Sequence, residues 1–301
     1  MKNEKRRLAV LFGGRSGEYA VSLQSAAAVL VCIDPAQYEV FPIGITRQGE
    51  WRHYTGPYEA ILADDWWADT AHNAPAVFSA SPSQRGFWRL AKGAQVFVPL
   101  DLAFPVLHGQ NGEDGRVQGL LELSGLPVAG CGTLSSALCM DKHRAHLLAH
   151  CAGVAVPRGV AFGRAERAVG LPQALQALRF PLFVKPLRSG SSLGVSRAAR
   201  PEELPSAIDL ALLEDSQVLV EEEVEGFEVG CAILGNEKLT VGRVDEIELC
   251  GGVFDYEEKY TLKTAKIHLP ARVDAAAEQR IQQAAVAVYR ALGCRGFARV
   301  D

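Results

Sequence analysis

Three segments combine glycines with charged side chains, and each follows an apolar run that predicts a buried strand. Residues 13–18 read GGRSGE, residues 108–115 read HGQNGEDG, and residues 185–194 read KPLRSGSSLG. Glycines let a backbone approach a ligand closely, and the amides at a helix start attract anions. Each segment therefore predicts a ligand-binding loop, although a plain tight turn explains residues 13–18 equally well.

The side chains of these loops indicate their chemistry. Glu18 supplies a carboxylate suited to a substrate ammonium, and His108 ends a strand where α/β sheets bind ligands. Lys185 opens a Gly/Ser loop that holds an arginine, which predicts a phosphate cradle of amides, hydroxyls and cations. Neither a dinucleotide fingerprint nor a Walker A loop is present. The alternatives are a solvated acidic turn at residues 108–115 and a flexible hairpin turn at residues 185–194.

A run of acids, EEEVEGFE, covers residues 221–228 between two predicted strands. Such a run is usually a solvated edge. It indicates a binding site only in combination with the lysine loop and with a metal ligand further along the chain.

The elements that position these loops change in character along the chain. Up to about residue 133, an initial strand (8–12), a glycine turn and a helix (22–33) predict an α/β domain with a parallel sheet. Later strands of this domain are expected at 38–46 and 101–107, with a helix within 111–124. A further, amphipathic helix is expected at 141–151. A long charged loop is expected at 249–263, and a helix at 275–292 is followed by a strand at 296–301.

Beyond Val154 short strands come with few helices, which predicts an α+β region of antiparallel hairpins. The strands are expected at 154–162, 182–186, 194–197, 218–223, 227–234 and 239–247, and the helices at 171–178 and 202–213.

Composition excludes several classes of protein. Apolar residues make up 48% of the 301 residues, and the net charge is −4. The chain has no excess of basic residues that would favour nucleic acid or an anionic membrane as a partner. No apolar run approaches the roughly 18 residues of a membrane span. The seven cysteines include no C-x-x-C pair, which favours buried free thiols over disulfides or zinc ligands. We expect a soluble, cytoplasmic protein.

Taken together, the motifs resemble those of the ATP-grasp ligases, and among them the D-alanine–D-X ligases of bacterial cell-wall synthesis. The resemblance runs from about Leu8 to Asp301 and rests on the segments GGRSGE, VSL, HGQNGEDG, MDKHRA, KPLRSGSS, EEEVEGFEVG, FDYEEKY and GCRGFARVD. Residues 43–51 and 256–263 are most similar to D-alanine–D-serine ligases of the VanG type.

The resemblance implies a fold and a division of the chain. A Rossmann-like (pre-ATP-grasp) substrate domain would span 1–133, followed by a two-lobed ATP-grasp fold with lobes at 134–220 and 221–301. It also implies ATP and Mg²⁺ (or Mn²⁺) as cofactors and a homodimer as the assembly.

The resemblance further assigns the nucleotide-binding residues. Lys142 and Lys185 would contact the ATP phosphates, together with the loop hydroxyls of Ser191 and Ser192. The adenine and ribose would lie at Glu221, Glu222 and Val224, and a ribose hydroxyl at Glu228.

The remaining assignments concern the substrates and the metal. Glu18 would bind the ammonium of D-alanine, with His108 beside it. Ser191 and Tyr260 would join Glu18 in a network that closes the loop. Arg299 would stabilise charge at the acyl centre, and Asp301 would bind magnesium. Lys259 and Tyr260 replace the histidine of D-lactate-using relatives, which favours an amine as nucleophile.

The implied reaction has two steps. The carboxylate of D-alanine attacks the γ-phosphate of ATP and forms an acyl phosphate, and the amine of D-serine or D-alanine then displaces phosphate. Both steps gather negative charge, which cations stabilise. The product would enter peptidoglycan synthesis, which supports cell shape, and would serve vancomycin resistance if it ends in D-serine.

Three alternatives to this reading stay open. The chain could be an ATP-grasp ligase for another carboxylate, which the segment HGQNGEDG argues against. It could be a nucleotide-binding pseudo-enzyme, which would bind ATP without releasing ADP. A nicotinamide-dependent oxidoreductase is least favoured, because the dinucleotide fingerprint is missing.

One departure from the family pattern generates a prediction. The family continues past R-V-D with a Glu-x-Asn metal pair and a glycine loop, so the ATP-grasp fold is expected to be truncated here. One carboxylate holds Mg²⁺ poorly, because the ion requires octahedral oxygen ligation.

We therefore expect the 301 residues alone to bind ATP weakly and to form no dipeptide, whereas a chain continued with such a segment (the extended chain) is active. A phosphate-release assay with ATP, Mg²⁺, D-alanine and D-serine checks this. Turnover of about one per second or faster by the 301 residues would contradict it.

Overall fold

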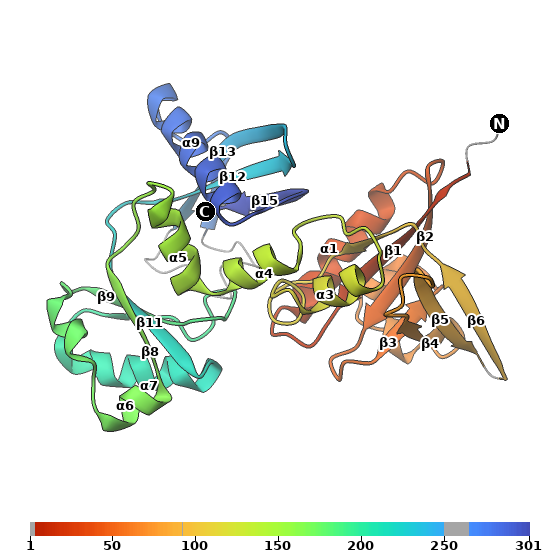
Figure 1. The fold of residues 1–301 in the computed structure, drawn as a ribbon, viewed down its shortest axis with the longest axis horizontal. Helices are drawn as coiled ribbons and strands as arrows, with labels where there is room; N and C mark the ends of the chain where they lie inside the picture. The colour runs from red at the N-terminus through yellow and green to blue at the C-terminus, as the bar shows by residue number, and fades with distance from the viewer. Residues whose placement is uncertain (1–3, 92, 250–264) are drawn as a thin grey trace. The chain divides into compact units, whose positions relative to one another are not determined.

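The computed structural model describes residues 4–91, 93–249 and 265–301 (Figure 1). The chain divides into two compact units, Met1–Ser136 and Ala137–Asp301, and each is described by itself. Of the predicted loop at 249–263, only Leu249 lies within the described residues, as the last residue of a strand.

The first unit contains a seven-stranded sheet in the order β6-β5-β4-β3-β2-β1-β7. Strand β1 pairs in parallel with β2 and with β7, and the other pairs are antiparallel. The predicted parallel sheet is therefore wrong for the β2 to β6 half. The strands are β1 (Arg6–Gly13), β2 (Tyr38–Ile45), β3 (Trp51–Tyr54), β4 (Asn73–Phe78), β5 (Gly86–Ala91), β6 (Ala94–Pro99) and β7 (Leu102–Pro105).

Connection lengths explain the mixed sheet. The chain from β1 to β2 passes through helix α1 (Tyr19–Cys32), which is long enough for a parallel crossover. The link from β2 to β3 is a tight turn, in which the amide of Gly49 donates to the carbonyl of Thr46 over 2.9 Å. Such a turn can only reverse the strand direction.

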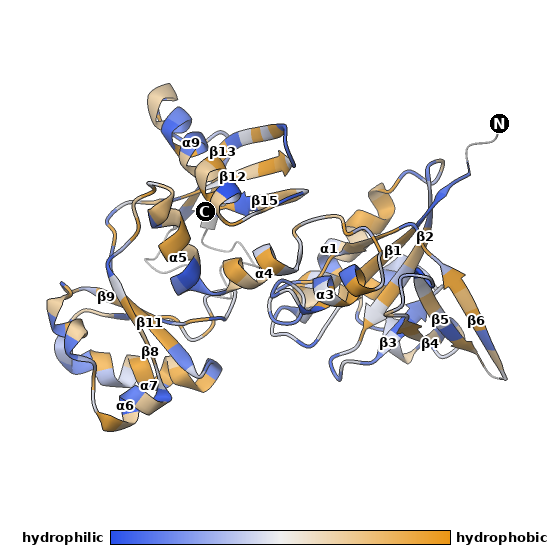
Figure 2. Ribbon diagram, in the orientation of Figure 1, coloured by the Kyte–Doolittle hydropathy of each residue, from blue (hydrophilic) through white to orange (hydrophobic). Residues whose placement is uncertain are grey.

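Strand β1 contributes to apolar layers on both faces of this sheet. Ala9 and Leu11 pack in a cluster with Val117 and Leu121 of helix α3 (Arg116–Leu123). Leu8, Val10 and Phe12 point the other way, into a cluster with α1 and with helix α2 (Tyr58–Leu62). This run is coloured as hydrophobic in Figure 2. Burial on both faces explains why the run is continuously apolar.

The second unit contains two four-stranded sheets. The first has the order β10-β9-β11-β8, and every pair in it is antiparallel. The second has the order β14-β13-β12-β15 and is also antiparallel. The strands are β8 (Gly159–Gly163), β9 (Leu182–Pro186), β10 (Ser196–Ala198), β11 (Gln217–Glu222), β12 (Glu228–Gly235), β13 (Leu239–Leu249), β14 (Ala265–His268) and β15 (Phe297–Val300).

Two helices of the second unit begin at aspartates that cap them. Asp141 and Asp274 accept hydrogen bonds from the amides of Arg144 and Ala277, as N-cap residues do. They start α5 (Lys142–Cys151) and α9 (Ala275–Ala291), close to the predicted bounds. The other helices of this unit are α4 (Thr133–Met140, which begins in the first unit), α6 (Arg164–Val169) and α7 (Leu204–Glu214), with 3-10 helices at Gln173–Ala177 and Pro201–Glu203.

Several predicted bounds were wrong for local reasons. The helix expected at 171–178 is a short 3-10 helix that follows Pro172. The strand expected from residue 154 begins at Gly159, after the proline at position 157. Helix α1 begins at Tyr19 rather than at residue 22.

The predicted state of the cysteines was partly wrong. All six described cysteines are free thiols, as expected, but Cys32, Cys139 and Cys151 are exposed rather than buried. Apolar sequence neighbours misled here, because on a helix residues next to each other face different sides. Among the described residues, no helix is long and apolar enough to cross a membrane.

A buried histidine makes the stability of the first unit depend on pH. His53 of β3 is only 7% exposed and packs against the rings of Phe41 and Phe87, with centroids 5.9 and 5.2 Å away. Its Nδ1 is buried and has no hydrogen-bond partner among the described residues. Burial, and then the charge of Arg89, lower the pKa of His53 to about 4.

We predict that the folded state loses stability as the pH falls from about 6.5 to 4, because the unfolded chain takes up a proton on His53 before the folded one does. The loss assigned to His53 is about 1–3 kcal/mol. His53→Phe should remove it, and melting curves of both proteins at pH 7.5 and 4.5 measure the difference. Equal losses in both proteins would contradict the prediction.

Candidate active site

The first two motif loops meet at one edge of the seven-stranded sheet. Strands β1 and β7 are parallel neighbours, so the loops that follow them leave the same edge. The buried hydroxyl of Ser22 joins these ends, because it donates to the carbonyl of Val106 and accepts from the amide of Gly13 at 2.8 Å. Ser22 was not among the residues predicted from the sequence, although a serine within the apolar stretch of a helix indicates a buried hydrogen bond.

His108 is fixed at this edge by contacts on both ring nitrogens. Its Nε2 lies 3.0 Å from the hydroxyl of Ser25 on α1, and its Nδ1 lies 3.9 Å from a carboxylate oxygen of Glu113. Its carbonyl accepts from the hydroxyl of Ser16 at 2.8 Å. The ring keeps 31% exposure, so it can still meet a ligand.

Glu18 lies at the start of α1 against the His108 loop. Gly109 has a φ of +69°, and a Cβ placed on it would lie 1.8 Å from Oε2 of Glu18. A glycine is therefore needed both for the backbone conformation and for the space that the carboxylate occupies. The structure thus brings Glu18 and His108, two predicted substrate residues, to one place.

A pocket opens beside these loops in the first unit. Both glycine loops line it, and aromatic and basic side chains complete its wall. Its lining comprises Gly13, Gly14, Arg15, Ile45, Gly49, Trp51, Leu107, His108, Gln110, Asn111, Gly112 and Val117.

The second unit carries its charged groups on one face of a sheet. Val184 and Val218 pack with Ile208 of α7 in an apolar cluster on one face of β9 and β11. Lys185 and Glu221 occupy the alternate positions of these strands, so their side chains point to the opposite face. A register slip of one residue would exchange the two faces.

Lys185 and Glu221 form an ion pair on that face. The Lys185 ammonium contacts Oε1 of Glu221 and lies 5.6 Å from the Phe183 ring. The Glu221 side chain is only 4% exposed, and its Oε2 accepts no hydrogen bond from a described residue. His146 of α5, a residue that the sequence reasoning missed, places Nδ1 at 3.6 Å from this oxygen.

Lys142 is bound to the glycine-serine loop. Its amide donates to the carbonyl of Leu187 over 3.2 Å, and its ammonium donates to the carbonyl of Ser189 over 2.5 Å. The loop also holds Ser191 and Ser192 at φ of 48° and 56°, an uncommon conformation for residues other than glycine. Lys142, Lys185 and these serines thus belong to one surface of the second unit.

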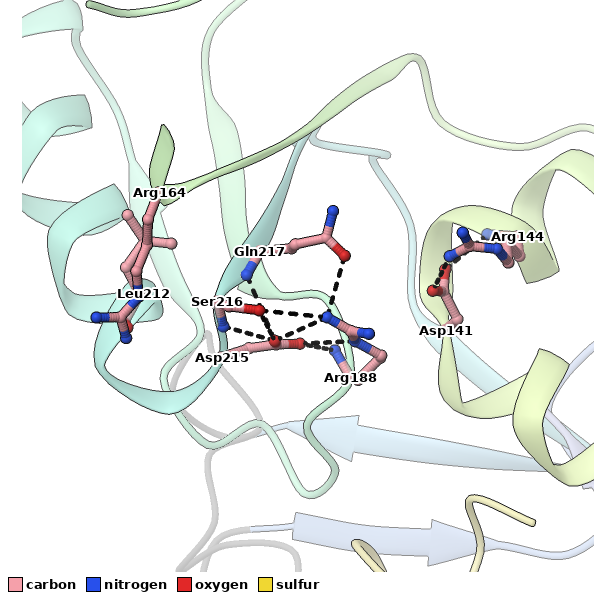
Figure 3. Close-up of polar contacts among 8 residues, drawn as sticks. All are labelled: Asp141, Arg144, Arg164, Arg188, Leu212, Asp215, Ser216 and Gln217. Carbon is pink, nitrogen blue, oxygen red and sulfur yellow. Dashed lines mark hydrogen bonds and ion pairs between the residues drawn. The ribbon is translucent and has the colours of Figure 1, made fainter. Parts of the chain in front are cut away.

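Arg188 has a different role from the one expected within the phosphate cradle. Figure 3 shows its guanidinium paired with Asp215 and Gln217, at the start of β11. The Arg188 amide also donates to Asp215 over 2.8 Å. The arginine therefore anchors the loop to the sheet.

The acid run is divided between two faces. Glu222 points away from Glu221, and its carboxylate accepts from the amide of Arg179 at 3.0 Å and lies 3.4 Å from Arg158. Val224 is 70% exposed, and Glu228 begins β12 as an exposed residue. The nucleotide-binding roles of Glu222, Val224 and Glu228 stay predictions.

Arg299 lies across β12 in the other sheet. Its guanidinium is 3.1 Å from Asp245 of β13 and 3.1 Å from Asp301. A Cβ on Gly230 of β12 would lie 2.4 Å from two of its nitrogens, so the glycine makes room for this crossing. Asp245 is a second residue that the sequence reasoning missed.

The residues fit the expected cofactors to different degrees. Two ammoniums and a buried acceptor oxygen suit a triphosphate and an amino group. For Mg²⁺, Asp245 and Asp301 are both near Arg299, and no group of three or more His, Cys, Asp or Glu among the described residues could hold a metal. The metal-binding role of Asp301 stays a prediction.

Two further predicted residues, Lys259 and Tyr260, lie outside the described residues. The network expected among Glu18, Ser191 and Tyr260 therefore stays a prediction.

Comparison with known proteins decides the family. A family model described as D-ala D-ala ligase N-terminus matches residues 7–131, and one described as D-ala D-ala ligase C-terminus matches residues 148–301. The chain belongs to the D-alanine–D-alanine ligase family. The predicted resemblance is thereby confirmed.

Individual relatives of the family cover nearly all of the chain. The vancomycin C-type resistance protein VanC1 of Enterococcus gallinarum is 43% identical over 297 residues, which cover 98% of this chain and 84% of the relative. A D-alanine–D-alanine ligase of Thermoanaerobacter is 39% identical over 301 residues, 99% of this chain and 83% of the relative.

Solved structures of the family confirm the predicted ATP-grasp fold. The VanG D-Ala:D-Ser ligase of Enterococcus faecalis superposes with a TM-score of 0.91 at 54% identity, over 99% of this chain and 85% of that one. The D-alanine–D-alanine ligase of Coxiella burnetii gives 0.84 at 29% identity, over 99% and 80%.

We predict that Gly109→Ala raises the KM for D-alanine at least about tenfold in the extended chain, because the added methyl displaces the Glu18 carboxylate. Gly93→Ala is the matched control, since Gly93 has a φ of +77° but nothing within 4 Å of a Cβ. Both variants should lose about 1 kcal/mol of stability, as measured by urea unfolding. Equal KM values in the two variants would contradict the role of Glu18.

Proposed function

We propose that this protein is an ATP-dependent ligase that joins D-alanine to a second D-amino acid through a D-alanyl phosphate. D-Serine is the favoured second substrate and D-alanine the other candidate. The product would serve peptidoglycan precursor synthesis and, if it ends in D-serine, vancomycin resistance. The observation that carries the proposal is the buried Glu221 carboxylate, which pairs with Lys185 through one oxygen and accepts no hydrogen bond from a described residue on the other.

The nucleotide would bind on the charged face of β9 and β11. Lys142 and Lys185 neutralise the phosphates, and the open Oε2 of Glu221 accepts from the amino group of adenine. Since an unsatisfied buried oxygen costs free energy, such a donor is favoured there. Asp301 would be a ligand of Mg²⁺ among the described residues, and the ion would supply positive charge to neutralise the phosphates.

The first substrate would bind at the edge of the seven-stranded sheet. Glu18 pairs with the ammonium of D-alanine, and His108 positions the amino acid from the next loop. The carboxylate of D-alanine is then free to attack the terminal phosphate. Arg299 stabilises the negative charge that develops when the second amine attacks the acyl carbon.

The choice of D-serine is supported by likeness and by chemistry. The 54% identity to the VanG D-Ala:D-Ser ligase exceeds the 39% identity to the D-alanine–D-alanine ligase of Thermoanaerobacter. Lys259 and Tyr260 occupy the place where D-lactate-using relatives carry a histidine, so an amine nucleophile is favoured.

Three further features belong to the proposal. The protein would act in the cytoplasm and as a homodimer. The sequence-based domain bounds are 1–133, 134–220 and 221–301. The boundary at 220/221 would fall inside β11 (Gln217–Glu222), which pairs along its length with β8 and β9. We therefore place this boundary after β11.

Product analysis tests the proposal. The extended chain is incubated with ATP, Mg²⁺ and D-alanine, alone or with equal D-serine or D-lactate, and ADP and dipeptides are quantified. We expect ADP release coupled to D-alanyl-D-serine as the main product. ATP binding without ADP release would indicate a pseudo-enzyme, and a product that lacks D-alanine would overturn the proposed substrate.

We predict that Lys185→Ala weakens ATP binding by about 2–4 kcal/mol, roughly 30- to 800-fold, because one charge-assisted phosphate contact is lost. Calorimetry of the 301-residue chain measures the affinity. Lys238→Ala, at the exposed turn between β12 and β13, is the control. Unchanged affinity in Lys185→Ala would contradict the phosphate role.

Since Lys185 also neutralises Glu221, the variant must be shown to be folded. Its melting curve is recorded beside that of the double variant with Glu221→Gln, in which no buried charge is left unpaired.

A further inference from the structure

The buried carboxylate of Glu221 lies between two basic groups. Oε1 is held by the Lys185 ammonium, and Oε2 lies 3.6 Å from Nδ1 of His146 without a hydrogen bond. The two oxygens of one side chain are therefore unequal: one is neutralised, and the other is available to whichever donor comes nearest.

His146 reaches this oxygen because of its place on α5. It follows Lys142 by four residues, so both side chains lie on one face of the helix. The His146 side chain is 33% exposed. It is thus a half-buried group with solvent access on one side and a carboxylate oxygen on the other.

The charges around His146 oppose its protonation. Burial lowers its pKa below 6.5, and the charges of Lys185, His143 and Lys142 lower it further, whereas Glu221 raises it. The ring is therefore neutral at pH 7.5 and takes up a proton only in acid.

We propose that His146 is a positioning residue of the nucleotide site, whose neutral ring leaves Glu221 Oε2 open to the amino group of a 6-aminopurine and whose protonated ring takes this oxygen instead. This proposal rests on the proposed function, because it requires that a nucleotide binds beside Glu221. It goes beyond that function in assigning His146 a role.

The consequence is a reciprocal coupling between a proton and the nucleotide. If the protonated ring competes for Oε2, bound nucleotide must in turn disfavour the proton. The pKa of His146 should then fall further when ATP binds. The apparent Kd for ATP should rise by up to about tenfold for each pH unit below the pKa of His146.

The direct test is NMR titration of the histidine ring protons in the 301-residue chain, without nucleotide and with saturating ATP. The His146 signal is assigned by its loss in His146→Leu. We expect its pKa to fall by at least about half a unit with ATP. A pKa that stays the same or rises overturns the proposal.

A second measurement uses calorimetry with ATP at pH 8.0 and 5.5. Because ATP's own phosphate titrates near pH 6 in every sample, the readout is the ratio of the two Kd values, compared between proteins. The ratio should be larger in the wild type than in His146→Leu. His150→Gln, an exposed histidine on the same helix, should keep the wild-type ratio.

The outcomes separate this proposal from the proposed function. A wild-type chain that binds no ATP at pH 8.0 overturns both. A chain that binds ATP with the same pH ratio in wild type and His146→Leu overturns the role of His146 alone. A ratio that falls equally in His150→Gln also overturns it, since the effect would then be one of net charge.

Discussion

The ion pair between the partly exposed Lys185 and the buried Glu221 is the constraint on which the first sheet of the second unit depends. Burying a carboxylate costs several kcal/mol, and the attraction of the ammonium offsets this only in good geometry. Here the geometry comes from strand register, because β9 and β11 alternate between an apolar face and a charged one. The pair therefore requires the same register that buries the valines on the other face.

The two carboxylate oxygens of Glu221 have different surroundings, so the pair can serve ligand binding as well as the stability of the fold. A structural pair would satisfy both oxygens, whereas here the buried Oε2 accepts no hydrogen bond from the described residues. Such a group is tolerated at a cost of about 1–3 kcal/mol, which a ligand that donates to it recovers. Lys185 of β9 contacts the other oxygen, and Nδ1 of His146 of α5 lies 3.6 Å from Oε2.

Two glycines each leave space for a charged side chain. Gly109 leaves room for the Glu18 carboxylate in the first unit, and Gly230 leaves room for the Arg299 guanidinium in the second. In each case a charged side chain lies against a backbone that has no Cβ.

The motif loops and their strands could be predicted from the sequence because apolar runs, glycines and caps are local signals. Asp141 and Asp274 begin helices near the expected residues. The antiparallel half of the first sheet could not be predicted so well, because the pairing of β3 to β6 depends on the turns that connect them. Arg188 was expected in the phosphate cradle, because its actual partner, Asp215, lies 27 residues further along the chain and is not a local signal.

His146 and Asp245 were missed because nothing in their local sequence marks them. Each gains its role from a partner on another element, Glu221 in one case and Arg299 in the other. The roles of Tyr260 and Lys259 rest on resemblance to the family.

The most direct test of the nucleotide site compares ATP with ITP, which carries an oxygen in place of the adenine amino group. Calorimetry at pH 8.0 gives the two affinities for the wild-type chain. If Glu221 Oε2 accepts from the amino group, ATP should bind about 5- to 150-fold more tightly, the equivalent of about 1–3 kcal/mol. Equal affinities for ATP and ITP would contradict the account.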